Sequence, residues 1–116
     1  MTDDDRGAAV RTYYRAIDDG AYDDLASLLA ADFVHRRPDR TLEGRDRFVR
    51  FMRDERPNPD TVHSVDAVYA DADADSGERA ARGRLFDAGG EELFAFVDVF
   101  RFDDADRLVE LRTFTR

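Results

Sequence analysis

An alternating aromatic segment at residues 94–102 constrains the fold of this chain more than any other feature. It reads Phe-Ala-Phe-Val-Asp-Val-Phe-Arg-Phe, and the side chains of an extended strand alternate between its two faces. One face therefore carries Asp98 together with four rings, those of Phe94, Phe96, Phe100 and Phe102. A carboxylate among buried rings must be hydrogen-bonded, protonated or paired with a cation such as Arg82 or Arg84, because an isolated buried charge is very costly. We interpret Asp98 as either a structural anchor or the polar centre of a ligand pocket.

Length and composition predict one globular domain that covers residues 1–116. A chain of 116 residues is long enough for a single core and too short for two. It has no cysteine, which excludes disulfides, zinc–thiolate sites and thiol nucleophiles. No apolar run approaches the roughly 18 residues of a membrane span, and the first residues are rich in aspartate where a signal peptide would be basic. We therefore expect a cytoplasmic protein without membrane partners.

The charged residues are unusual in kind as well as in sign. All 18 basic residues are arginine, and 21 of the 27 acidic residues are aspartate. We interpret this bias as adaptation of a halophilic organism to a high-salt cytoplasm, because short hydrated carboxylates keep a protein surface soluble there. The codon bias of a GC-rich genome is the alternative. The net charge of −9, with no evident basic face, argues against a nucleic-acid partner.

Helical periodicity predicts three helices in the N-terminal half. The first begins at the aspartates 3–5, ends at Gly20 and carries an apolar stripe that consists of Val10, Tyr13, Tyr14 and Ile17. A second, short helix has Asp23 and Asp24 in its first turn, and a short strand follows at residues 33–37. The third begins after Gly44 and ends at the prolines 57 and 59, with an inner face formed by Phe48, Phe51 and Met52.

The C-terminal half has the pattern of four strands joined by tight turns, at residues 61–70, 79–87, 92–102 and 108–115. In the first of these, alternation places four side chains on one face, those of His63, Val65, Ala67 and Tyr69. The aspartates of residues 71–75 resemble the start of a calcium loop, but the required glycine and glutamate are misplaced, so we interpret them as a polar turn. Helices followed by hairpins predict an α+β domain, an antiparallel sheet with helices on one face.

Few residues remain that can carry chemistry. His35 and His63 are the only histidines, and neither lies at a metal-ligand spacing from another ligand, so we expect no metal site and no cofactor. The chain has no phosphate-binding glycine loop and no nucleophile-elbow motif, which leaves carboxylates, tyrosine and arginine for an enzyme. Tyr13 lies on the inward stripe of the first helix, either as a core residue or as a hydroxyl that faces a pocket.

Several segments, in their order and spacing, resemble the nuclear-transport-factor-2-like superfamily in its SnoaL-like branch. They are residues 13–20, 22–34, 42–48, 96–104 and 108–112. The resemblance implies a cystatin-like, cone-shaped fold in which a strongly curved antiparallel sheet packs against three N-terminal helices around an open apolar pocket. It also implies a homodimer that forms through the sheet.

The ketosteroid isomerases of this superfamily offer the closest functional comparison. Tyr13 has the spacing of their oxyanion tyrosine from the end of the first helix, and Asp98 precedes a Phe-x-Phe pair as their second oxyanion donor does. Their general base is an aspartate directly before a proline, where this chain has Arg37 before Pro38. Since arginine cannot accept a proton at physiological pH, the resemblance implies that this base is missing. The epoxide-hydrolase branch would require an arginine where Phe96 stands.

Two hypotheses of function follow. The first is a pocket protein that binds a small, largely apolar molecule, which Arg37 would favour as an anion because a guanidinium offers a planar bidentate fork. The second is an enzyme that acts on a small carbonyl compound, as an isomerase or a cyclase, with Tyr13 and Asp98 polarising an oxygen and another group, such as His35, as base. The residues that we expect to line the ligand site are Arg37, His35, Phe51, Phe96 and Phe100.

Overall fold

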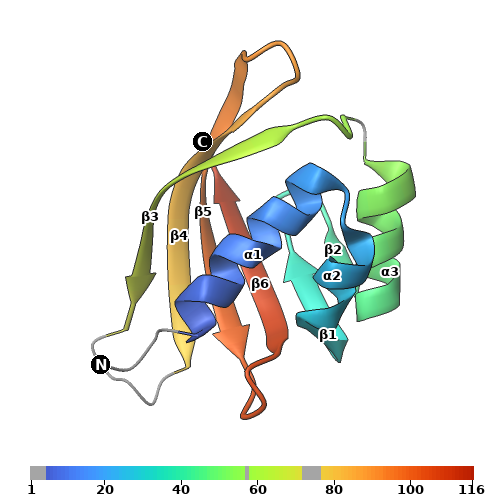
Figure 1. Ribbon diagram of the computed structural model, residues 1–116, viewed down its shortest axis with the longest axis vertical. Coiled ribbons are helices and arrows are strands. Elements are labelled where there is room, and N and C mark those ends of the chain that lie inside the picture. The colour runs from blue at the N-terminus through green and yellow to red at the C-terminus, as the bar shows by residue number, and fades with distance from the viewer. Residues whose placement is uncertain (1–4, 57, 72–76) are drawn as a thin grey trace.

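Three helices and a six-stranded sheet make up the structure, a computed structural model that describes residues 5–56, 58–71 and 77–116 (Figure 1). The elements in chain order are α1 (Asp5–Asp19), α2 (Tyr22–Ser27), β1 (Leu29–Arg36), β2 (Thr41–Glu43), α3 (Arg45–Arg50), the π-helical turn η1 (Phe51–Glu55), β3 (Val62–Ala70), β4 (Glu78–Phe86), β5 (Glu92–Phe102) and β6 (Leu108–Thr115). All three predicted helices and all five predicted strands are confirmed. The three-residue strand β2 is an addition, because so short a segment carries no measurable periodicity.

The strand order is β2-β1-β6-β5-β4-β3, and the sheet is mixed. Strands β3 to β6 form the predicted antiparallel hairpins, whereas β1 pairs with β6 in parallel, with His35 opposite Leu111. The expectation of a wholly antiparallel sheet is therefore wrong at this one pairing. The long connection between β1 and β6 leaves their relative direction free of any hairpin constraint, so packing of the whole domain decides it.

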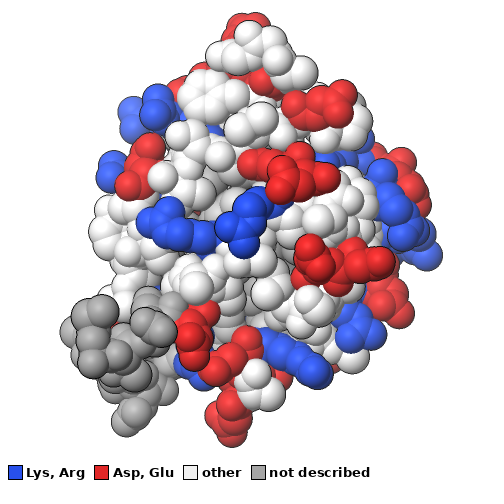
Figure 2. Space-filling view, viewed as in Figure 1, with Lys and Arg blue, Asp and Glu red and all other residues white. Residues whose placement is uncertain are grey.

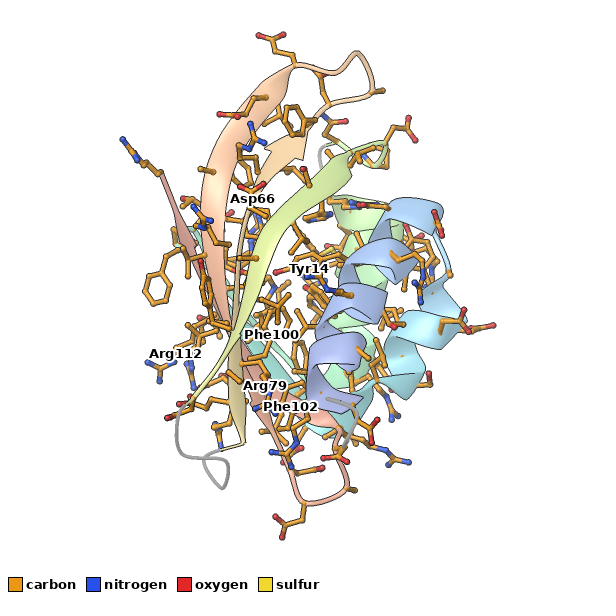
Figure 3. All side chains as sticks on the ribbon, turned by 60° about the vertical axis from the view of Figure 1, so that its left-hand side comes forward. Tyr14, Asp66, Arg79, Phe100, Phe102 and Arg112 are labelled. Carbon is orange, nitrogen blue, oxygen red and sulfur yellow. The ribbon has the colours of Figure 1, made fainter. Side chains whose placement is uncertain are left out.

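The helices cover one face of the curved sheet, and the core lies between the two layers (Figures 1 and 3). The apolar stripe of α1 is buried there, as predicted, together with alternate residues of β5; the fully buried large side chains include Phe33, Phe48, Phe51, Phe100, Leu108 and Leu111. Gly20 ends α1 with a φ of 68°, a conformation that favours glycine. Figure 3 shows Arg112 on the other face of the sheet, away from the helices.

Strand β3 departs from simple alternation at Asp66. Its pairing with β4 shifts by one residue there, so that Val65 lies opposite Gly83 while Ala67 lies opposite Arg82. After this bulge Val68 faces the core, and Tyr69 is 51% exposed. The prediction that Tyr69 shares a face with His63 is therefore wrong, because one extra residue in a strand reverses the side of every residue that follows.

The described residues include no helix long and apolar enough to cross a membrane and no cluster of three potential metal ligands. Figure 2 shows acidic and arginine side chains interspersed over the face that it displays. The start of the acidic N-terminal segment, Pro57, and the aspartate-rich turn after Asp71 lie outside the described residues, so the predictions made for them are not tested.

Candidate functional site

A cavity of about 270 Å³ lies between the helices and the sheet. Its polar lining residues are Tyr13, His35, Arg37, Arg56, Asn58, Thr61, His63, Asp98, Thr113 and Thr115, and its apolar ones are Ile17, Pro38, Met52, Leu85, Leu93, Phe94 and Phe96. Buried residues such as Tyr13 and Phe96 form its inner part, whereas Leu93 is 43% exposed and stands at the outside. An apolar cavity with a few converging polar groups is the usual form of a small-molecule site.

Asp98 is held by two hydroxyl groups. The Tyr14 hydroxyl donates to Oδ2 over 2.6 Å, and the Thr113 hydroxyl donates to Oδ1 over 2.5 Å. Thr113 can do so because the β5–β6 register places it directly opposite Asp98. On the other neighbouring strand the residue opposite is the buried Ala81. Asp98 is therefore the hydrogen-bonded anchor of the core, and Figure 3 shows Tyr14 between α1 and the sheet.

The suggestion that an arginine of β4 neutralises Asp98 is wrong. Arg82 and Arg84 are both exposed, and Arg84 lies 3.6 Å from carboxylate oxygens of Asp66 and Glu92. They point away from Asp98 because Ala81 and Gly83 take the inward positions of this strand. Gly83 has no room for a side chain, since a Cβ there would collide with the Ser64 carbonyl.

Burial raises the pKa of Asp98, and the hydrogen bonds from Thr113 and Tyr14 partly oppose that rise. Burial and the neighbouring Asp98 raise the pKa of Tyr14 far above its usual range, so Tyr14 stays a hydroxyl donor at any physiological pH. Burial therefore favours the neutral form of both groups, while the two hydrogen bonds that Asp98 accepts favour its charged form and hold it in place.

His35 extends this network on the sheet side. Its Nε2 lies 2.8 Å from the Thr113 hydroxyl oxygen. Because Thr113 gives its proton to Asp98, Nε2 must carry the proton that His35 donates, and Nδ1 has a free lone pair. Nδ1 is buried and has no hydrogen-bond partner. Burial, followed by the nearby Arg37, lowers the pKa of His35 to about 3, so the ring is neutral.

Tyr13 lines the cavity but does not reach Asp98. Its ring packs edge-on against Tyr14 and Phe100, at centroid distances of 5.2 and 5.4 Å. Burial raises its pKa well above the usual value. Within the described part of the chain its hydroxyl makes no hydrogen bond, and it is not among the polar atoms sealed from solvent. Tyr13 therefore offers a hydroxyl donor to a molecule in the cavity.

A second histidine of the cavity is oriented by an aspartate. His63 Nδ1 lies 2.6 Å from Oδ1 of Asp18, and the backbone N–H of His63 donates to Oδ2 of the same carboxylate over 2.9 Å. Asp18 belongs to the last turn of α1 and His63 to the start of β3, so the contact joins the helix layer to the sheet. The His63 ring packs on Tyr14 and Phe96.

Two arginines line the cavity, and their guanidinium groups have different partners. Arg37 pairs with Asp39 over 3.1 Å and stacks on the Phe51 ring, 5.2 Å from its centroid, so it does not pair with Asp98. The guanidinium of Arg56 is held by neutral oxygens instead and forms no salt bridge with the described residues.

Of the residues predicted for the site, five line the cavity: Tyr13, His35, Arg37, Phe96 and Asp98. Phe51 and Phe100 do not, because Phe51 lies under two arginines and Phe100 is fully buried in the core. The sequence prediction missed Tyr14, Asp18, Arg56, His63 and Thr113. Two of them had a signal: Tyr14 belongs to the same helical stripe as Tyr13, and His63 is one of two histidines and shares its strand face with Val65.

The sequence model of the SnoaL-like domain matches residues 10–111, so the chain belongs to the SnoaL-like domain family. Among solved structures it is similar to a proposed ketosteroid isomerase from Kribbella flavida, with 24% identity and a TM-score of 0.81 over 100% of this chain and 82% of that one. It is also similar to a protein with a cystatin-like fold from Methylobium petroleophilum, with 18% identity and a TM-score of 0.83 over 99% and 78% of the two chains.

An LEH-like epoxide hydrolase from M. tuberculosis is a further structural relative, with 17% identity and a TM-score of 0.75 over 96% of this chain and 82% of that one. No curated protein matches the sequence. At these identities the structural matches establish a shared fold, and the chemistry of this chain depends on its own cavity.

Proposed function

We propose that this protein binds a small, largely apolar molecule that carries an anionic oxygen, in the cavity between the helices and the sheet. The observation that carries the proposal is Arg56, a cation that lines an apolar cavity without a carboxylate partner among the described residues. In a chain with a net charge of −9, carboxylates are abundant. An arginine at the cavity wall that lacks a carboxylate partner is available for an anion supplied by a ligand.

The guanidinium of Arg56 is fixed in place by its neutral contacts. Nε donates to the Met52 carbonyl over 2.8 Å and Nη1 to the Thr61 hydroxyl over 3.2 Å, and Nη2 donates to the Pro59 carbonyl over 2.8 Å and to the Tyr22 hydroxyl over 3.4 Å. These four bonds hold the planar group, leave one N–H of Nη1 for an anion and leave the charge without a carboxylate partner among the described residues. Binding an anion there requires little rearrangement, because the donor is already oriented.

One further polar group can orient the ligand within the cavity. Tyr13 presents a hydroxyl donor there, whereas Nδ1 of His35 is sealed from the cavity. A carbonyl or hydroxyl oxygen on the ligand would accept the hydrogen bond from Tyr13. The alternative from the sequence, in which Tyr13 and Asp98 polarise one oxygen, has less support, because both oxygens of Asp98 already accept hydrogen bonds from Tyr14 and Thr113.

Calorimetry with matched ligands tests the proposal. We expect phenylacetate to bind at least about tenfold more tightly than phenylacetamide, because a charge-assisted hydrogen bond exceeds a neutral one by about 1.4 kcal/mol or more. Arg56→Gln should remove this preference, whereas Arg53→Gln, an exposed arginine of the same turn that pairs with Asp54, should keep it. Equal affinities for the two ligands, or a preference that survives Arg56→Gln, would refute the anionic site.

A further inference from the structure

We propose that His63, oriented by Asp18, is a general base that removes a proton from carbon in a molecule bound in the cavity. The inference rests on the proposed function only in that the substrate must enter the same cavity. The resemblance of the sequence to the ketosteroid isomerases does not involve this pair. It occupies a different wall of the cavity from Arg37, which stands where the isomerase base was expected.

The Asp18 carboxylate fixes both the position and the tautomer of His63. It accepts the backbone N–H of His63 over 2.9 Å and the ring at Nδ1 over 2.6 Å. A carboxylate accepts hydrogen bonds and cannot donate them, so Nδ1 carries the proton. Nε2 is then the atom with the free lone pair, and the carboxylate stabilises the imidazolium that forms when Nε2 takes a proton.

The free nitrogen lies on the cavity side of the ring. His63 lines the cavity whereas Asp18 does not, so the edge opposite the Asp18 contact is the one that faces inward. Nε2 makes no hydrogen bond with the described residues, and it is not a polar atom sealed from solvent. The ring is held by Tyr14 and Phe96, at centroid distances of 5.0 and 5.7 Å, which limits its freedom to turn.

His35 is not an equivalent base. Its Nε2 is committed to Thr113, and its buried ring has a pKa of about 3, which makes it a weak acceptor near neutral pH. The ring of His63 has one hydrogen-bonding partner among the described residues, the Asp18 carboxylate, and its side chain is 15% exposed. The two histidines therefore have different roles: His35 belongs to the buried network with Thr113, and His63 has a ring nitrogen without a partner at the cavity.

The proposed step is a proton abstraction next to an electron-withdrawing group. The proton passes from carbon to Nε2 of His63, and the C–H electron pair moves toward the acceptor group, whose oxygen gains negative charge. The Tyr13 hydroxyl, which has no partner within the described residues, can donate a hydrogen bond to that oxygen. The step needs no oxidant, reductant or bound metal, and the proton can return from Nε2 to carbon.

The probe reaction is the ring opening of 5-nitrobenzisoxazole. A base removes the proton at C3, the C–H electrons form a nitrile as the N–O bond breaks, and the product phenolate is measured by its visible absorbance. We expect turnover by the wild-type protein, and His63→Gln to lower kcat at least about 100-fold, the range of general-base catalysis, with KM changed less than about threefold. Asp18→Asn should lower kcat as well, because an amide that donates to Nδ1 moves the proton to Nε2.

Asp19→Asn is the matched control, since Asp19 is the exposed neighbour of Asp18 on the same helix, and its kcat should equal that of the wild type. Ring nitrogen chemical shifts of His63 provide the readout that a purely structural contact would not move. The wild type should show protonated Nδ1 and unprotonated Nε2, and Asp18→Asn should shift the proton toward Nε2. This measurement decides the tautomer even if His63→Gln fails to fold.

Two results overturn the proposal. One is a wild-type protein that binds the probe, seen as shifts of cavity resonances, but turns it over no faster than His63→Gln does. The other is a protonated Nε2 in the wild-type protein. Neither result affects the carboxylate preference tested through Arg56, so failure of the base and failure of the binding site are distinguishable.

Discussion

The lowered pKa of the buried His35 makes the stability of this protein depend on pH. In the folded state burial lowers its pKa from 6.5 to about 3, while in the unfolded chain the ring returns to its ordinary value. The folded state therefore excludes a proton that the unfolded state accepts. The contribution of His35 to stability is complete above pH 6.5 and is lost as the pH falls toward 3.

The size of the effect follows from the difference between the two pKa values. Each pKa unit corresponds to about 1.36 kcal/mol, so complete titration would remove about 5 kcal/mol, and lowering the pH from 8 to 4.5 about 3 kcal/mol. His35 is 4% exposed, so solvent does not screen this cost substantially. Asp98 has the opposite effect on stability as the pH falls, because its raised pKa makes proton uptake more favourable in the folded state than in the unfolded state.

Comparison with His35→Gln isolates the contribution of His35, since Asp98 and the surface carboxylates are present in both proteins. The glutamine amide can still donate to Thr113 but does not titrate. We expect urea unfolding, followed by far-UV circular dichroism, to show that the wild type loses about 3 kcal/mol more than the variant between pH 8 and 4.5. Equal losses in the two proteins would refute a neutral buried His35.

The remaining predictions concern packing, assembly and salt. Tyr14→Phe should destabilise the fold by about 1–3 kcal/mol because Asp98 loses a buried donor, and Tyr13→Phe, at the neighbouring residue, should cost less in urea unfolding. Gly83→Ala should cost about 1–3 kcal/mol because its Cβ would meet the backbone of β3; a wild-type urea midpoint would contradict this. We propose that the exposed face of the sheet forms a homodimer, on which Phe114 is 56% exposed, so light scattering should give a dimer for the wild type and a monomer for Phe114→Arg. Finally, the melting temperature should fall as the Debye length grows from ~3 Å at 1 M salt to ~30 Å at 0.01 M, and an unchanged value would contradict the halophilic interpretation.

Local patterns in the sequence specify the elements and the inward faces of most of them. The apolar stripe of α1 follows the helical repeat of 3.6 residues and correctly places Tyr13 in the interior. The alternation of β5 follows the strand repeat of 2 residues and correctly places Asp98 there. The order and spacing of five short segments also indicate the family, which the match over residues 10–111 confirms. Such patterns work because burying an apolar face is a requirement of each helix or strand by itself.

Which of these residues meet depends on the tertiary structure alone. Tyr13 and Tyr14 are about 100° apart around α1, and the rotation of the helix against the sheet selects Tyr14 for Asp98. Thr113 reaches Asp98 through the β5–β6 register, and Asp18 reaches His63 across 45 residues of sequence. Contacts of this kind depend on how complete elements pack against one another, which no local repeat encodes. The cavity and its candidate base are therefore properties of the assembled fold.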